Sequence, residues 1–206
     1  MKRLSIAALA AVSLSTTVSF STIAAQAQDA PSGTYALDPT HTTVIWSVSH
    51  GGFSLYRGSF DDVEGTLTWD ADEPTGSALT VTIDANSVDS PAAGSHAGND
   101  NFQQDIAKKA LGAEDNPEIT FTSTSLRRTG DDSGVVTGDL SFNGTTKPVE
   151  MDVTLIQAAD FMGTPKMGFS GETTIDRAEW GSNAWTEFGI GTDVTISIQS
   201  EFAKTE

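Results

Sequence analysis

Three histidines are the side chains of this 206-residue chain best suited to bind a metal ion or to transfer a proton. His41, His50 and His96 are widely separated, whereas compact zinc motifs place ligands only a few residues apart. Folding could still gather them, and histidine with aspartate could then support hydrolysis. The spacing favours a simpler arrangement, with His41 in a turn and His50 as a hydrogen-bonded rim residue ending a strand. No metal site is predicted.

Adjacent carboxylates are the second chemical signal. Asp61-Asp62 and Asp131-Asp132 look like acid pairs, but a glycosidase needs two carboxylates facing each other across a cleft. Each pair falls in an expected turn, where water solvates it. No Gly-x-Ser-x-Gly elbow occurs, and Gly189-x-Gly191 lacks the third glycine of a dinucleotide loop. The sequence therefore predicts no enzymatic activity.

Arg177 is the most distinctive single charge, because the aromatic Trp180 follows it closely. Its guanidinium could bind a ligand headgroup or pair with a carboxylate at the end of the fold. Acids outnumber bases 28 to 11, which favours the structural pairing. His41, His50, Arg177 and Trp180 are kept as candidates for a headgroup or rim site.

Composition limits the partners of the chain. The formal net charge is −17, and such a surface repels nucleic acid and anionic lipid headgroups. The chain has no cysteine, which excludes disulfides, thiol catalysis and a cysteine-linked lipid anchor.

The first 27 residues have the features of a secretory signal. Lys2 and Arg3 precede a mostly apolar run, and Ala25-Gln26-Ala27 offers a small-x-small cleavage pattern. Several serines and threonines make the segment too polar for a good membrane span. We expect a signal peptide at 1–27, export to the periplasm, and one domain at 28–206.

The most regular stretch is a hairpin between Val135 and Leu155. Apolar and polar residues alternate on both arms, which is typical of strands with one buried face. Asn143-Gly144 lies between the arms, where positive φ angles let the chain reverse. Gly138 falls on the apolar face and is expected to leave room beside it.

Similar alternation recurs along the chain. Further strands are expected at 35–37, 42–50, 53–60, 63–69, 79–83, 119–123, 167–175 and 194–202. One short helix is expected from Asn101 to Leu111, where apolar residues repeat at helical spacing and Gly112 follows as a stop. So many antiparallel strands must protect their edges, as a closed up-and-down barrel or a sandwich does.

Several phrases resemble the YceI-like family across nearly the whole expected domain. The matching residues are Tyr35-x-Leu37-Asp38-Pro39-x-His41, Val48-x-His50-x-Gly52, Gly58-x-Phe60, Asn116 to Ser123, Gly138 to Val149, and Arg177-x-x-Trp180-Gly181. The resemblance implies an all-β fold: an extended, antiparallel, up-and-down, lipocalin-like barrel of about eight strands with one short helix. It also implies a periplasmic protein that holds a long isoprenoid chain, of the polyprenyl quinone or polyprenyl phosphate type, in an internal tunnel.

Large apolar residues of the inner faces are the candidates for the tunnel wall. They are Trp46, Val48, Phe53, Phe60, Leu67, Val81, Phe102, Ile106, Phe121, Leu140, Phe142, Met151, Val153, Leu155, Phe169, Ile196 and Ile198. No cofactor is expected apart from a bound polyprenyl lipid or quinone. The expected partner is an isoprenoid lipid and not nucleic acid, and transient membrane contact and a homodimer are both compatible with the chain. An exported, stress-related adaptor with a sealed barrel, binding proteins through its loops, is the alternative.

Overall fold

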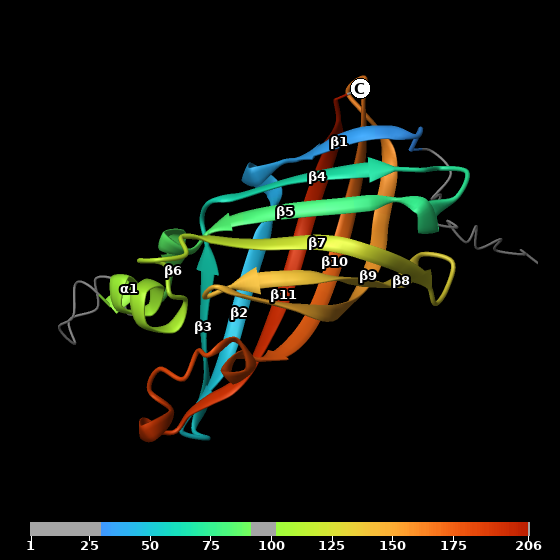
Figure 1. Ribbon diagram of the computed structural model, residues 1–206. Coiled ribbons are helices and arrows are strands. Elements are labelled where there is room, and N and C mark those ends of the chain that lie inside the picture. The colour runs from blue at the N-terminus through green and yellow to red at the C-terminus, as the bar shows by residue number, and fades with distance from the viewer. Residues whose placement is uncertain (1–29, 92–101, 206) are drawn as a thin grey trace, which may run out of the picture.

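The computed structural model describes residues 30–91 and 102–205, and its strands wrap around a common interior (Figure 1). The expected signal segment 1–27, His96 and Asn101 lie outside the described residues. The strands are β1 (Gly33–Leu37), β2 (Thr43–His50), β3 (Ser54–Phe60), β4 (Val63–Trp69), β5 (Ala78–Asp84), β6 (Val88–Asp89), β7 (Glu118–Arg128), β8 (Ser133–Phe142), β9 (Thr145–Phe161), β10 (Thr164–Asp176) and β11 (Ile190–Lys204). Short helical turns connect some of them: η2 (Pro39–His41), η3 (Pro74–Gly76), η4 (Ala85–Ser87), η6 (Arg177–Trp180) and η7 (Thr186–Phe188).

Eight of these strands close into a barrel. They follow the order β1, β4, β5, β7, β8, β9, β10 and β11, and β11 pairs back onto β1 with Phe202 opposite Leu37. All of these pairings are antiparallel. Closure removes the unpaired edges that an open sheet would leave, and the prediction of an all-β barrel of about eight strands is confirmed.

Three neighbouring barrel strands, β1, β4 and β5, are interrupted at the same level of the wall. Beyond the interruption β2 continues the line of β1 beside β11, β3 continues that of β4, and β6 continues that of β5. The breaks are tied together: the amide of Asp61 donates to the Ser87 carbonyl at 3.1 Å, and that of Asp84 to the Asp62 carbonyl at 3.1 Å. The wall turns here, so β2 and β3 run away from β1 and β4 in Figure 1. We call β2, β3 and β6 the wing.

The hairpin of β8 and β9 forms as its sequence predicts. Asn143 and Gly144 both have positive φ, at 48° and 72°, which is the backbone of a turn that matches strand twist. Phe142 lies opposite Thr145 directly across this turn. The register keeps the alternating apolar residues of both arms on the inner face.

The expected helix is present beside the wing. It comprises α1 (Phe102–Asp105) and a wider π-helical turn, η5 (Ile106–Ala110), closed by a bond from the Leu111 amide to the Ile106 carbonyl at 3.1 Å. Gly112 follows with φ +66°, a conformation that favours glycine at a helix end. Ile106 and Ala107 are buried against the barrel. No helix within the described ranges combines the length and the apolar character that a bilayer crossing requires.

Two groups of packed side chains occupy the two ends of the fold. The first includes Tyr35, Trp69, Met167 and Phe202, and the Tyr35 hydroxyl and Trp69 indole donate to backbone carbonyls of the N-terminal lead. The second gathers around η5 and Trp180. The space between these groups is where a ligand could lie.

Candidate ligand-binding cavity

A cavity of about 500 Å³ runs through the interior between the two packed groups. This volume falls within the range of sites that hold small organic ligands. Its wall is almost wholly apolar, with contributions from Val44, Ile83, Met151 and Ile198 among many others. An interior of this kind can accept a hydrocarbon chain, because among the described residues the indole N–H of Trp46 is the one buried side-chain polar group without a hydrogen-bond partner.

Nearly all of the side chains expected to line a tunnel lie on this wall. They are Trp46, Val48, Phe60, Leu67, Val81, Phe102, Ile106, Phe121, Leu140, Phe142, Met151, Val153, Phe169, Ile196 and Ile198. Their contact with a ligand remains a prediction. Strand parity locates these residues because each strand turns one face to the interior.

Two of the expected wall residues are elsewhere. Phe53 is 94% exposed, because Gly51 and Gly52 turn the chain with positive φ and β3 begins only after Phe53. Leu155 is buried in the packed group with Met167 and does not reach the cavity. Both expectations are therefore corrected.

The room expected beside Gly138 is filled by a neighbouring ring. A Cβ atom at Gly138 would lie 2.6 Å from Cε2 of Phe121 and 2.6 Å from the carbonyl oxygen of Thr122. These separations are far inside van der Waals contact. Gly138 thus lets Phe121 pack flat on β8, and it does not mark empty space.

Aromatic side chains surround one end of the cavity. Tyr56 lies 5.9 Å from Trp46 and 6.2 Å from Phe102 by ring centroids, and Phe102 lies 5.7 Å from Trp185. The wing, the helix and the loop between η6 and β11 each supply part of this ring. Phe188 also lines the cavity while 73% of it is exposed. The cavity therefore opens at this end, which we call the mouth.

Tyr56, Trp185 and Phe188 were not singled out from the sequence. Tyr56 has the same parity as Phe60, and the strand between them pairs in regular register, with Gly58 opposite Trp46. This alternation is the signal that could have placed Tyr56 on the wall. Trp185 and Phe188 lie in an irregular loop, where no period reveals orientation.

Arg177 lines the cavity, and its guanidinium holds the adjacent loop. Its Nε donates to the Gly191 carbonyl at 3.0 Å, Nη1 to the Ser182 carbonyl at 2.9 Å, and Nη2 to the Ala184 carbonyl at 2.8 Å. The side chain is 7% exposed. Burial lowers the pKa of the guanidinium from its usual value, against the opposing charge of Asp176. The expected carboxylate pairing is replaced by bonds to backbone carbonyls.

Trp180 is a core residue and does not lie at the rim. It is 3% exposed, stacks on Phe142 with centroids 5.4 Å apart, and donates its indole N–H to the Leu140 carbonyl at 3.1 Å. His50 does lie on the cavity wall near the mouth, with its ring centroid 6.4 Å from that of Tyr56. Of the rim candidates, His50 alone combines a wall position with high exposure.

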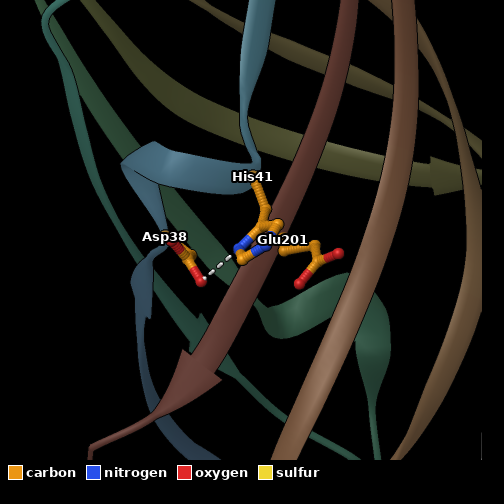
Figure 2. Close-up of side chains that lie close together, drawn as sticks. All are labelled: Asp38, His41 and Glu201. Carbon is orange, nitrogen blue, oxygen red and sulfur yellow. Dashed lines mark hydrogen bonds and ion pairs between the residues drawn. The ribbon is translucent and has the colours of Figure 1, made fainter.

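His41 lies in the turn η2, as expected, but on the outer surface at the bend of the wall. Its Nδ1 is 2.9 Å from Oδ2 of Asp38, and Figure 2 shows Glu201 close by. These three residues could offer nitrogen and oxygen ligands to a metal. However, the ammonium of Lys166 lies 3.4 Å from Asp38 and 3.2 Å from Glu201. The four residues therefore form an ion-paired network that stabilises the bend, and this network accounts for their close approach.

The pKa shifts agree with such a network. Hydrogen bonds from Thr40 and then His41 hold the pKa of Asp38 well below its usual range. The hydrogen bond with Glu201 raises the pKa of Lys166, against partial desolvation. Asp38 also accepts the Thr40 amide at 3.0 Å as the cap of η2. Asp38, Lys166 and Glu201 thus form ion pairs that hold the chain in position at the bend.

Known proteins of similar sequence align with most of this chain. A UPF0312 protein of Pectobacterium atrosepticum is 36% identical over 163 residues, which cover 78% of this chain and 80% of the relative. Protein YceI of Escherichia coli O17:K52:H18 is 34% identical over 188 residues, covering 88% and 94%.

Solved structures share the fold at lower identity. Burkholderia cenocepacia BcnA matches with a TM-score of 0.67 and 21% identity, covering 80% of this chain and 98% of its own. A polyisoprenoid binding domain from Saccharophagus degradans matches with a TM-score of 0.64 and 17% identity, covering 83% and 98%.

The sequence model of a protein family, the YceI-like domain, matches residues 35–202 of this chain, from β1 to near the end of β11. This range includes all the strands that close the barrel and the residues that line its cavity. The chain therefore belongs to the YceI-like domain family.

Proposed function

We propose that this protein is an exported, non-enzymatic carrier or store that holds a long isoprenoid chain in its cavity. The observation that carries the proposal is the apolar cavity of about 500 Å³ that crosses the barrel and opens at the mouth. A solved member of the same fold is a polyisoprenoid binding domain, which supports this class of ligand. The signal features of residues 1–27 support export to the periplasm.

Hydrocarbon burial alone could supply the affinity. Moving a CH₂ group out of water contributes about 0.8 kcal/mol, so one five-carbon unit contributes on the order of 4 kcal/mol before ordering costs. A chain of several units would then bind without a strong polar anchor. The wall is suited to this mode because it presents the flexible Met151 beside branched and aromatic residues.

The polar end of the ligand is expected at the mouth. Within the described part of the chain, Arg177 is the one wall residue with a permanent charge, and its donors are engaged by loop carbonyls. A headgroup placed deep in the cavity would therefore lose its water and meet only neutral groups, such as wall hydroxyls and the unpaired indole N–H of Trp46. A polyprenyl quinone or polyprenyl phosphate can avoid this loss by leaving its head near His50 and solvent.

The adaptor alternative depended on a sealed barrel. The interior holds a cavity that opens at the mouth, so no observation favours that alternative over the carrier.

Organic extraction of the purified protein, followed by mass spectrometry, tests the proposal. We expect a polyprenyl lipid or quinone in the extract at up to one molecule per protein. A delipidated sample should take up an added polyprenyl quinone. Empty extracts from several preparations, together with no uptake, would contradict the carrier function. Intact mass of the same material checks export: residues 1–27 should be absent.

A further inference from the structure

We infer that the mouth of the cavity docks on an electrically neutral lipid bilayer through three exposed apolar side chains, Phe53, Leu55 and Phe188. The inference rests on the proposed carrier function, because it names the surface with which the ligand is exchanged. Phe53 is 94% exposed, Phe188 73% and Leu55 58%. Solvent exposure of this extent is costly for large apolar groups that gather in one place.

The three side chains come from two tips that are joined to each other. Phe53 follows the turn between β2 and β3, and Phe188 ends η7. The amide of Gly51 donates to the Gly189 carbonyl at 3.0 Å, and His50 pairs with Ile190 just behind this bond. Both tips therefore project together at the lower end of the molecule in Figure 1.

The projecting surface is continuous with the cavity. Phe188 contributes to the cavity wall and to the exposed tip at once. Trp185, at the start of the same turn, lines the cavity and contacts Phe102 of the helix. A hydrocarbon chain leaving the mouth would thus pass beside the side chains that face outward. Whatever covers these side chains also faces the exit of the ligand.

Charge favours a neutral lipid surface as the occupant. Residues 50–56 and 185–190 carry a single carboxylate, Glu187, although the chain as a whole has a net charge of −17. Anionic lipids would be repelled by the rest of the molecule, whereas neutral headgroups would not. Each tip is a chain reversal with glycine at positive φ: Gly51 and Gly52 in one, and Gly189 in the other. Projecting apolar tips suit insertion into a fluid interface, as amphipathic anchors do.

The opposite end of the barrel supplies a matched control. Phe161 and Met162 form the β9–β10 tip and are 61% and 92% exposed. Neither residue lines the cavity, and the Lys166 ammonium lies 5.7 Å from the Phe161 ring centroid. If exposure alone caused membrane binding, this tip would bind as well as the mouth.

Flotation with phosphatidylcholine vesicles tests the inference, using purified protein whose N-terminus has been verified by intact mass. The mouth variant is Phe53→Ser with Phe188→Ser, and the control variant is Phe161→Ser with Met162→Ser. We expect the wild type and control to float alike. The mouth variant should partition at least about tenfold more weakly, since burying one Phe is worth roughly that factor. Trp185 is one of four tryptophans and lies beside the mouth, so vesicles with brominated tails should quench the tryptophan fluorescence of the wild type and control more than that of the mouth variant.

Other outcomes overturn the docking inference. Equal flotation of all three proteins would show that the mouth is not special, and no flotation of any would show that the bilayer is not the occupant. If light scattering finds a dimer that only the mouth variant dissociates, a second copy covers the tips. A polyprenyl lipid in the extract of a protein that does not float leaves the carrier function standing. Equal melting temperatures confirm that the variants fold.

Discussion

Val153 offers the sharpest test of whether the cavity receives a ligand. It lies on β9 opposite Gly134 of β8 and Gly171 of β10, and it faces the cavity. Both neighbours in the sheet lack side chains, but Met151 and Leu126 occupy the space over them, so a larger side chain at position 153 must extend into the cavity. A tryptophan at this position has open volume to enter, so we expect Val153→Trp to fold with stability within about 1 kcal/mol of the wild type.

The same substitution should weaken lipid binding. An indole in the cavity displaces roughly one five-carbon unit, whose burial is worth at most about 4 kcal/mol. The ligand can recover part of this by shifting toward the mouth. We therefore expect a loss of at least ~1.4 kcal/mol, which is tenfold in Kd.

Leu155→Trp is the matched control on the same strand. Leu155 packs with Met167 and Phe202 at the closed end and does not reach the cavity. Enlarging it should cost about 1–3 kcal/mol of stability through overpacking, while binding per folded molecule stays unchanged. Denaturant unfolding of delipidated protein and titration with a polyprenyl quinone measure both quantities. The reasoning fails if Val153→Trp loses as much stability as the control and binds lipid normally.

Three further predictions concern single residues. Gly138→Ala should cost about 1–3 kcal/mol in urea unfolding, because its Cβ would strike the adjacent phenyl ring. Gly168→Ala, whose nearest neighbours lie 4.0 Å away, should be nearly neutral and serves as its control. Arg177→Met leaves buried carbonyls unpaired and should cost on the order of 3 kcal/mol, whereas the exposed Arg57→Met should cost little. The lowered pKa of Asp38 means that its contribution to stability is complete above about pH 4 and is lost as pH falls toward its folded pKa. The stability gap between wild type and Asp38→Asn should therefore shrink on acidification below about pH 4, and a gap independent of pH would contradict this.

The sequence predicted best where a local period and a local turn agree. On β8 and β9 the alternation specifies the inner face, and Asn143-Gly144 specifies the reversal, so the register follows. Most wall positions could be read from parity for the same reason, but parity did not show that Phe53 is exposed or that Leu155 lies in the packed end. The helix was also recognisable, because apolar spacing and Gly112 both mark it.

The mouth could not be read in this way. Arg177 binds carbonyls of residues five to fourteen positions ahead, and no sequence period encodes bonds between a side chain and the backbone of a loop. Gly138 shows a second limit. A small residue on an inner face signals either empty space or a neighbour that fills it, and only the position of Phe121 on β7 decides between them.

Aspartate residues have a structural role at the bend of the wall. Asp38 caps η2 by accepting the Thr40 amide, and Asp84 caps η4 by accepting the Asn86 amide at 2.8 Å. The Asp62 carbonyl accepts a backbone bond in the gap between β3 and β4. Short polar side chains suit such positions because they satisfy amides that a broken strand leaves unpaired. The bend in turn directs the wing away from the closed barrel, and the wing supplies Trp46 and Tyr56 to the mouth. These aspartates lie outside the cavity but affect its length. They stabilise the point at which β1, β4 and β5 are interrupted, and the wing beyond that point extends the apolar interior.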